Sequence, residues 1–88
     1  MSKKVVDVLK YNAVFEPCEE GGFTVTFPKL PGVITEGDTF ENAVKMAKDA
    51  VKGHLLVLRE DGEDIPEPDE NSFVAPVSII FPGLKFAV

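Results

Sequence analysis

Residues 20–39 read EGGFTVTFPKLPGVITEGDT, and they contain the signals for a hairpin, a strand, a turn and the start of a helix. Its two adjacent glycines tolerate the positive φ angles of a tight hairpin. From Phe23 to Phe27, apolar side chains alternate with threonines, and this period of two predicts a half-buried strand over residues 22–28. The prolines and the glycine that follow predict a turn, after which residues 33–36 are expected to form a short strand.

Upstream of this stretch, residues 5–16 are predicted to form the first strand. Their apolar positions again recur with a period of two, at Leu9, Tyr11, Ala13 and Phe15. Joined by the hairpin and the turn, the three strands are expected to make an antiparallel meander.

Downstream of Gly37, the apolar period lengthens to between three and four residues, which is typical of an amphipathic helix. Thr39 is a suitable N-cap, and the acidic residues beside it favour the positive end of the helix dipole. The pattern begins at Phe40 and predicts a helix over residues 40–60. Gly62 is expected to end this helix as the C′ residue.

The C-terminal part of the sequence predicts further strands. Residues 73–81 alternate again and are apolar on both faces for much of their length, which predicts a fourth strand. Pro76 lacks an amide hydrogen, which places that end at a sheet edge or a bulge. The tail, residues 84–88, is a possible extra strand, and a bare apolar strand at a chain end promotes aggregation. We therefore expect it to pair with another chain through Leu84, Phe86 and Val88.

The predicted order β-β-β-α-β makes residues 1–88 a single α+β domain, with one long helix packed on a small, mainly antiparallel sheet. A chain of 88 residues buries only about 60–65% of the surface that it exposes when unfolded. A deep substrate cavity is therefore not expected. A partner or a second copy would cover the remaining apolar surface, and we expect a homo-oligomer.

The charge of the chain excludes some partners. Nine basic and fifteen acidic residues give a formal net charge of −6, so direct nucleic-acid binding is not expected, whereas a basic protein would be attracted. Seven of the acids lie between Glu60 and Glu70, with no basic residue among them. This segment has two interpretations, a solvated loop that keeps the protein in solution or a surface that faces a basic partner.

Candidate catalytic and metal-binding residues are sparse, and we expect neither an enzyme nor a cofactor. The single cysteine, Cys18, excludes an internal disulfide and a cysteine zinc cage, and neighbouring acids disfavour an activated thiolate. The only histidine, His54, falls beside the apolar stripe of the helix. A degenerate two-metal nuclease would need acids on neighbouring elements, for which the candidates are Asp7, Glu36 and Asp49. Neither an apolar run of about 20 residues nor a signal peptide is recognisable, so we expect a cytoplasmic protein without a membrane span.

Several motifs follow one another in a fixed order, namely Tyr11-x-Ala13-x-Phe15, Phe27-Pro28-x-Leu30-Pro31-Gly32, Gly37-Asp38-Thr39 and Ile65-Pro66-x-Pro68. In order and spacing, residues 10–68 resemble the N-terminal domain of HicB-type antitoxins. The resemblance implies a truncated ribonuclease-H-like fold that lacks the catalytic acids. It also implies a partner, a small basic toxin that cleaves messenger RNA and whose active site the antitoxin covers.

Two features depart from the family pattern. Many members have acids where this chain has Lys29 and Asn42, and both differences reduce the negative charge. Full-length members also carry a C-terminal DNA-binding domain, which this sequence lacks before Val88. We therefore expect no autoregulation by this chain alone.

The leading hypothesis is an antitoxin-like module that binds and neutralises a small basic ribonuclease toxin. Its expected contact surface combines the outer face of the helix with the acidic segment, and the candidate residues are Lys45, Lys48, Asp49, Lys52, Glu60, Asp61, Glu63 and Asp64. For the helix face, plain solvation is an equally acceptable interpretation. The alternative hypothesis is a self-associating structural or regulatory domain with no cognate toxin, joined through its tail strand.

Overall fold

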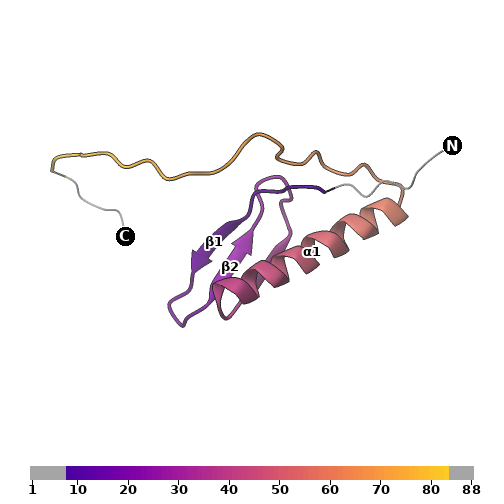
Figure 1. The fold of residues 1–88 in the computed structure, drawn as a ribbon, viewed down its shortest axis with the longest axis horizontal. Helices are drawn as coiled ribbons and strands as arrows, with labels where there is room; N and C mark the ends of the chain where they lie inside the picture. The colour runs from indigo at the N-terminus through magenta and orange to yellow at the C-terminus, as the bar shows by residue number, and fades with distance from the viewer. Residues whose placement is uncertain (1–7, 84–88) are drawn as a thin grey trace.

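The computed structural model describes residues 8–83 and contains, within them, three strands followed by one helix (Figure 1). The strands are β1 (Val14–Pro17), β2 (Phe23–Thr26) and β3 (Ile34–Gly37), and the helix is α1 (Phe40–Glu60). The α+β class, with one long helix on a small antiparallel sheet, is confirmed. The predicted tail strand lies outside the described residues, together with its proposed contacts Leu84, Phe86 and Val88.

The sheet is a meander in the order β1-β2-β3, and both strand pairs are antiparallel. Val25 of the central strand lies opposite Phe15 on one side and Thr35 on the other. The β1–β2 hairpin is closed by hydrogen bonds of 3.0 Å that join Cys18 to Gly21 and Gly22. These glycines have φ angles of 102° and 81°, which confirms the predicted positive φ at both positions of the turn.

The turn between β2 and β3 contributes a side chain to the core. The amide of Leu30 donates to the carbonyl of Phe27 (3.0 Å), and the carbonyl of Leu30 accepts from the amide of Val33 (3.1 Å). The Leu30 side chain points inward and is only 1% exposed, close to the 0% of Val25 in the central strand. The turn is therefore as much a part of the core as the strands that it joins.

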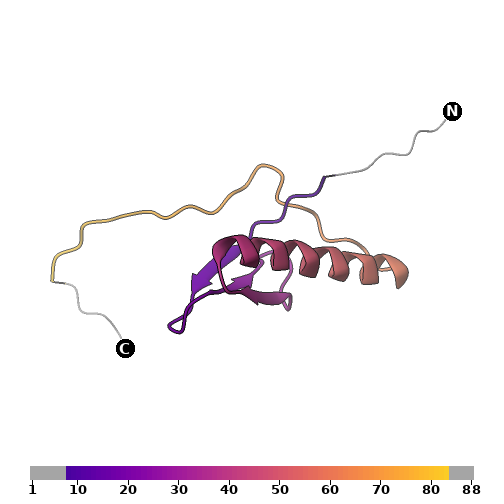
Figure 2. The same cartoon turned by 60° about the horizontal axis from the view of Figure 1, so that its bottom comes forward.

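The helix packs closely on β3 and β2 because the facing residues are small (Figure 2). Ala43 and Ala47 are its buried residues. A Cβ atom on Gly37 would lie 2.4 Å from the backbone nitrogen of Ala43, closer than real side chains approach. Gly37 is therefore required by the helix that passes over it, and not by its own φ angle.

Both ends of α1 are capped as the sequence predicts. The hydroxyl of Thr39 accepts from the amide of Asn42, and the side-chain oxygen of Asn42 accepts from the amide of Asp38, each at 3.0 Å. At the other end, the amide of Glu63 donates to the carbonyl of Leu58 (2.9 Å), and Gly62 between them has a φ of 73°. Asn42, one of the departures from the family pattern, therefore has a local role in starting the helix.

The predicted first strand, residues 5–16, is too long. Residues 8–13 are described, but the ladder with β2 begins only at Val14. The chain near Lys10 bonds instead to residues 66–72, which follow the helix and are named the returning segment. There the amide of Asp69 donates to the Lys10 carbonyl (2.7 Å). The backbone near Lys10 is therefore hydrogen-bonded to a loop and not to β2, so the sheet does not extend to these residues.

The predicted fourth strand is wrong for the chain taken alone. Residues 73–81, named the arm, are extended and exposed, and they run away from the sheet and the helix in both views (Figures 1 and 2). A strand needs a neighbouring strand that accepts and donates its backbone hydrogen bonds, as well as an alternating pattern. The arm has the pattern without the neighbour.

Candidate protein-binding surface

An apolar groove lies between α1 and the segment that leads into β1. The helix has 21 residues and is about 31 Å long, whereas each four-residue strand spans only about 13 Å, so the second half of the helix extends past the sheet. The chain from Leu9 to Phe15 lies along the helix, with Phe15 packed against Phe40 at the start of α1 (ring centroids 4.9 Å apart). The two walls enclose a groove of about 830 Å³.

The groove walls are apolar and its rim carries positive charge. One wall is lined by Leu9, Tyr11, Ala13 and Phe15, and the other by Val44, Ala47, Val51 and Leu55. Three cationic residues, Lys48, Lys52 and Arg59, also line it. Apolar walls with a charged rim are typical of a surface that binds a polypeptide.

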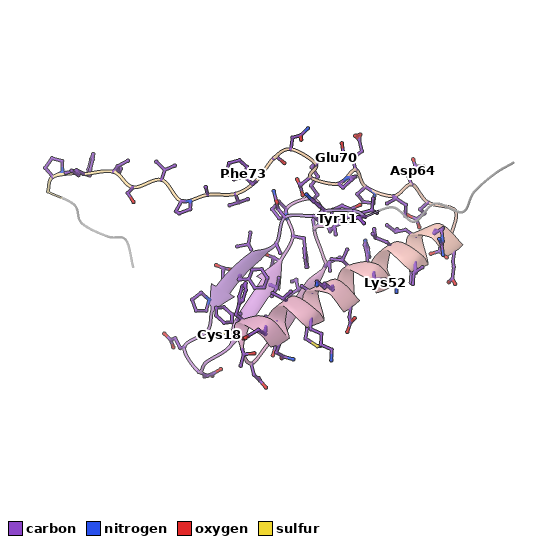
Figure 3. The ribbon with its side chains drawn as sticks, viewed as in Figure 1. Tyr11, Cys18, Lys52, Asp64, Glu70 and Phe73 are labelled. Atoms are coloured by element: carbon purple, nitrogen blue, oxygen red, sulfur yellow. The ribbon has the colours of Figure 1, made fainter. Side chains whose placement is uncertain are left out.

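The structure divides the predicted contact residues of the helix into two groups. Lys48 and Lys52 line the groove, and Figure 3 shows Lys52 on the helix. Lys45 and Asp49 are exposed on the same helix but do not line the groove. The groove itself was missed by the sequence analysis, because it depends on the difference in length between the helix and the strands.

The predicted acidic contacts gather at the C-terminal end of α1. Glu60, Asp61, Glu63 and Asp64 are all exposed, and Figure 3 shows Asp64 beside that end. The C-terminus of a helix carries the negative end of its dipole, so acidic side chains there do not stabilise the helix. The stability of the fold therefore does not explain their concentration at this point.

One acid of the same segment is structural. Asp69 is buried, with 7% of its surface exposed. Its carboxylate accepts from the amide of Asn12 (2.9 Å) and from the hydroxyl of Ser72 (3.2 Å). The sequence placed Asp69 among the surface acids, because the residue that it holds, Asn12, lies 57 residues away along the chain.

Tyr11 ties down the other end of the returning segment. Its hydroxyl donates to the carbonyl of Pro66. Burial raises the pKa of Tyr11 above its ordinary value, and the negative charge of Asp69 raises that pKa further. Between Pro66 and Ser72, the chain is therefore fixed against residues 10–12, so that the acids before it and the arm after it leave from defined points (Figure 3).

The candidate catalytic residues do not converge in the described part of the chain. Residues 8–83 contain no group of three histidine, cysteine or acidic side chains that would hold a metal ion. Glu36 and Asp49 are exposed, Asp7 lies outside the described residues, and His54 is half-buried in the helix. The half-buried thiol of Cys18 lies 3.3 Å from the hydroxyl of Thr24. Among the same residues, no helix has the length and apolar character needed to cross a membrane.

Comparison with known proteins finds a matching family and several relatives of this chain. A family model described as the HicB-like antitoxin of bacterial toxin-antitoxin systems matches residues 11–75. Antitoxin HicB 1 of Photorhabdus laumondii is 42% identical over 73% of this chain and 41% of its own length. Antitoxin HicB of Escherichia coli is 37% identical over 68% of this chain and 44% of its own length.

A shorter relative matches over most of its length. A UPF0150 protein of Thermoplasma acidophilum is 33% identical over 66% of this chain and 84% of its own length. The chain thus spans less than half of the two antitoxins but most of this protein. The family match includes the sheet, the helix and the returning segment, and it confirms the resemblance found in the sequence motifs. The chain belongs to the HicB-like antitoxin family.

Proposed function

We propose that this chain is an antitoxin that binds a small, basic, messenger-RNA-cleaving toxin and neutralises it by covering its active site. The observation that carries the proposal is the family match over residues 11–75, which contain the whole of α1 and its acidic end. The mechanism is steric and electrostatic occlusion. The chain itself performs no catalysis and needs no cofactor.

The proposed contact surface is centred on the acidic end of α1. Glu60, Asp61, Glu63 and Asp64 would face the basic surface of the toxin, since complementary charge speeds association and selects the partner. The helix would contribute the remaining proposed contacts, Lys45, Lys48, Asp49 and Lys52. The position of the acids supports this arrangement, because they are exposed where they do not stabilise the helix.

The test is an RNA-cleavage assay with the toxin, taken as the product of a small basic gene beside this one. Purified chain is titrated in, and we expect inhibition that saturates at a fixed stoichiometry. A toxin that cleaves RNA and is unaffected by the chain would contradict the proposal.

A matched pair of charge reversals locates the contact. Glu63→Lys with Asp64→Lys is expected to weaken toxin binding by about tenfold or more, mainly through a slower association rate at low salt. The control, Glu19→Lys with Glu20→Lys, changes the net charge equally but lies in the exposed β1–β2 turn. Equal losses in both variants would mean that only net charge matters, and no loss in either would remove the acidic end from the interface.

A second candidate function is favoured by the arm. A self-associating structural or regulatory domain without a toxin would explain why so many apolar side chains are exposed at residues 73–81. Such a domain would self-associate and leave RNA cleavage by the neighbouring gene product unchanged. Direct nucleic-acid binding is expected under neither function, because the chain is acidic.

A further inference from the structure

The groove beside α1 has a charge opposite to that of the chain. The whole chain carries a formal net charge of −6, whereas the charged residues that line the groove are Lys48, Lys52 and Arg59. Within residues 8–83, no acidic side chain lines it. Their spacing of four and seven residues puts the three cations on one side of the helix, so positive charge runs along one rim. An anion is therefore attracted to the groove, although the chain as a whole repels anions.

Between its walls, the groove offers apolar contact and few hydrogen bonds. Apart from Tyr11 and the three cations, every side chain that lines it is apolar. The hydroxyl of Tyr11 already donates to the carbonyl of Pro66. Sugars and nucleobases need several donors and acceptors from a binding site, so they do not suit these walls.

The same inventory distinguishes a hydrocarbon chain from a peptide. A charged rim is compatible with either, but the amide N–H groups of a bound peptide need acceptors. Among the described residues, no acid or side-chain amide lines the groove to accept from them. A hydrocarbon chain has no polar group along its length and therefore leaves nothing unpaired. The groove volume of about 830 Å³ also lies within the range of roughly 300–1,000 Å³ that is typical of small-molecule sites.

We propose that the groove binds a free long-chain carboxylate, with the hydrocarbon chain between the two walls and the carboxylate at the cationic rim. Figure 3 shows one residue of each wall, Tyr11 on the segment that leads into β1 and Lys52 on the helix. Burial of the hydrocarbon chain supplies most of the affinity, and the cations select the sign of the head group. The inference does not rest on the proposed function, because its test needs no toxin.

The first experiment titrates the chain with laurate, kept below its critical micelle concentration. Tyr11 lines the groove and the chain has no other tyrosine and no tryptophan, so tyrosine fluorescence reports binding there directly. We expect a saturable change with laurate, and about tenfold weaker binding of decanoate, which is shorter by two methylene groups. Dodecyltrimethylammonium has a hydrocarbon chain of similar length and the opposite charge. It should bind more weakly than laurate, although the net charge of the chain favours it. No saturable change with laurate, or tighter binding of the cation, would overturn the proposal.

Two matched pairs of variants locate the site. Lys52→Glu is expected to weaken laurate binding by about tenfold, whereas Lys29→Glu changes the net charge equally at an exposed position outside the groove and should have little effect. Leu56→Asn removes an apolar lining residue that is 40% exposed, and about tenfold weaker binding is expected. Its neighbour Val57 is 54% exposed and does not line the groove, so Val57→Asn is the control. Circular dichroism checks the fold of all four variants, and equal effects within either pair would contradict the assignment.

Sedimentation velocity without laurate tests the competing occupant, a second copy of the chain. If the groove is open to a ligand, Leu56→Asn and Val57→Asn should leave the association state of the chain unchanged. A shift towards monomer in Leu56→Asn alone would mean that a second copy covers the groove, and the proposal would fail.

Discussion

The central strand β2 and the arm have the same alternating apolar pattern but opposite environments. Val25 in β2 is fully buried between two strands and beneath the helix, whereas Ile80 in the arm is 100% exposed. The difference lies in what precedes and follows each segment. β2 is joined to its neighbours by two short turns that contain glycine, and the arm follows a long return across the surface. An alternating pattern therefore identifies a strand-forming segment, while the connections decide whether its own chain supplies the neighbour.

The largest effect is expected from removing a core side chain. Leu30→Ala should lower the free energy of unfolding by about 3–4 kcal/mol, because Leu30 is 1% exposed and its loss leaves a cavity. Ile80→Ala in the arm should change it by less than about 0.5 kcal/mol. Urea denaturation followed by circular dichroism measures both. A similar loss in the two variants would mean that the arm is packed on the core.

A smaller loss is expected from Gly37→Ala, which tests the close approach of helix and sheet. The added methyl group would meet the backbone of Ala43, so we expect a loss of about 2–3 kcal/mol. Gly53→Ala is the matched control, because nothing lies within 4 Å of the methyl group and alanine favours a helix by about 0.5–1 kcal/mol. The midpoint temperature of thermal unfolding should therefore fall for Gly37→Ala and rise for Gly53→Ala. A shift in the same direction for both variants would contradict the close packing of the helix on Gly37.

The boundary between the two regions is tested at Asp69. Asp69→Ala removes the acceptor of the Asn12 amide and should cost about 1–2 kcal/mol. The neighbouring exposed residue supplies the control, Glu70→Ala, with an expected change below about 0.5 kcal/mol. Amide exchange at Asn12 should accelerate in the first variant only. Unchanged exchange would show that the returning segment is not held by this carboxylate.

The smallest effect is expected from the ionisation of Tyr11. Its pKa is raised in the folded chain, so its contribution to stability is complete below the ordinary tyrosine pKa of about 10. That contribution is lost as the pH rises through the folded pKa. Because Tyr11 is the only tyrosine, absorbance at the tyrosinate wavelength reports it directly. Folded chain should titrate at higher pH than chain in urea, and coincident titrations would contradict the contact with Pro66 and Asp69.

The parts of the fold that could be predicted depend on neighbours in sequence. Hairpin, turn and both helix caps are specified within a few residues, and the structure has them as expected at Gly22, Thr39 and Gly62. The short β1 and the unpaired arm could not be predicted, because each depends on whether a distant segment supplies a strand. Periodicity identifies the face of a strand but not its partner.

The candidate binding surface also combines features that local sequence predicts with features that depend on distant segments. The charged residues of the helix and the acidic segment could be predicted as exposed, since runs of charge are rarely buried. The exception is Asp69, whose partner Asn12 lies 57 residues away in sequence. The groove was not predictable, because it results from a long helix beside short strands. Which of the charged residues contact a toxin stays a prediction.

The hydrogen bond between Asp69 and Asn12 has a consequence for the order of folding. The hairpin, the second turn and the helix start are closed by contacts between near neighbours, and such contacts form quickly. Joining Asp69 to Asn12 closes a loop of 57 residues, whose entropy cost is met only when the sheet and helix already hold the ends near each other. We therefore expect the returning segment to dock last, after the sheet and the helix have formed. Only then does the arm leave the folded unit from a defined point, next to Ser72.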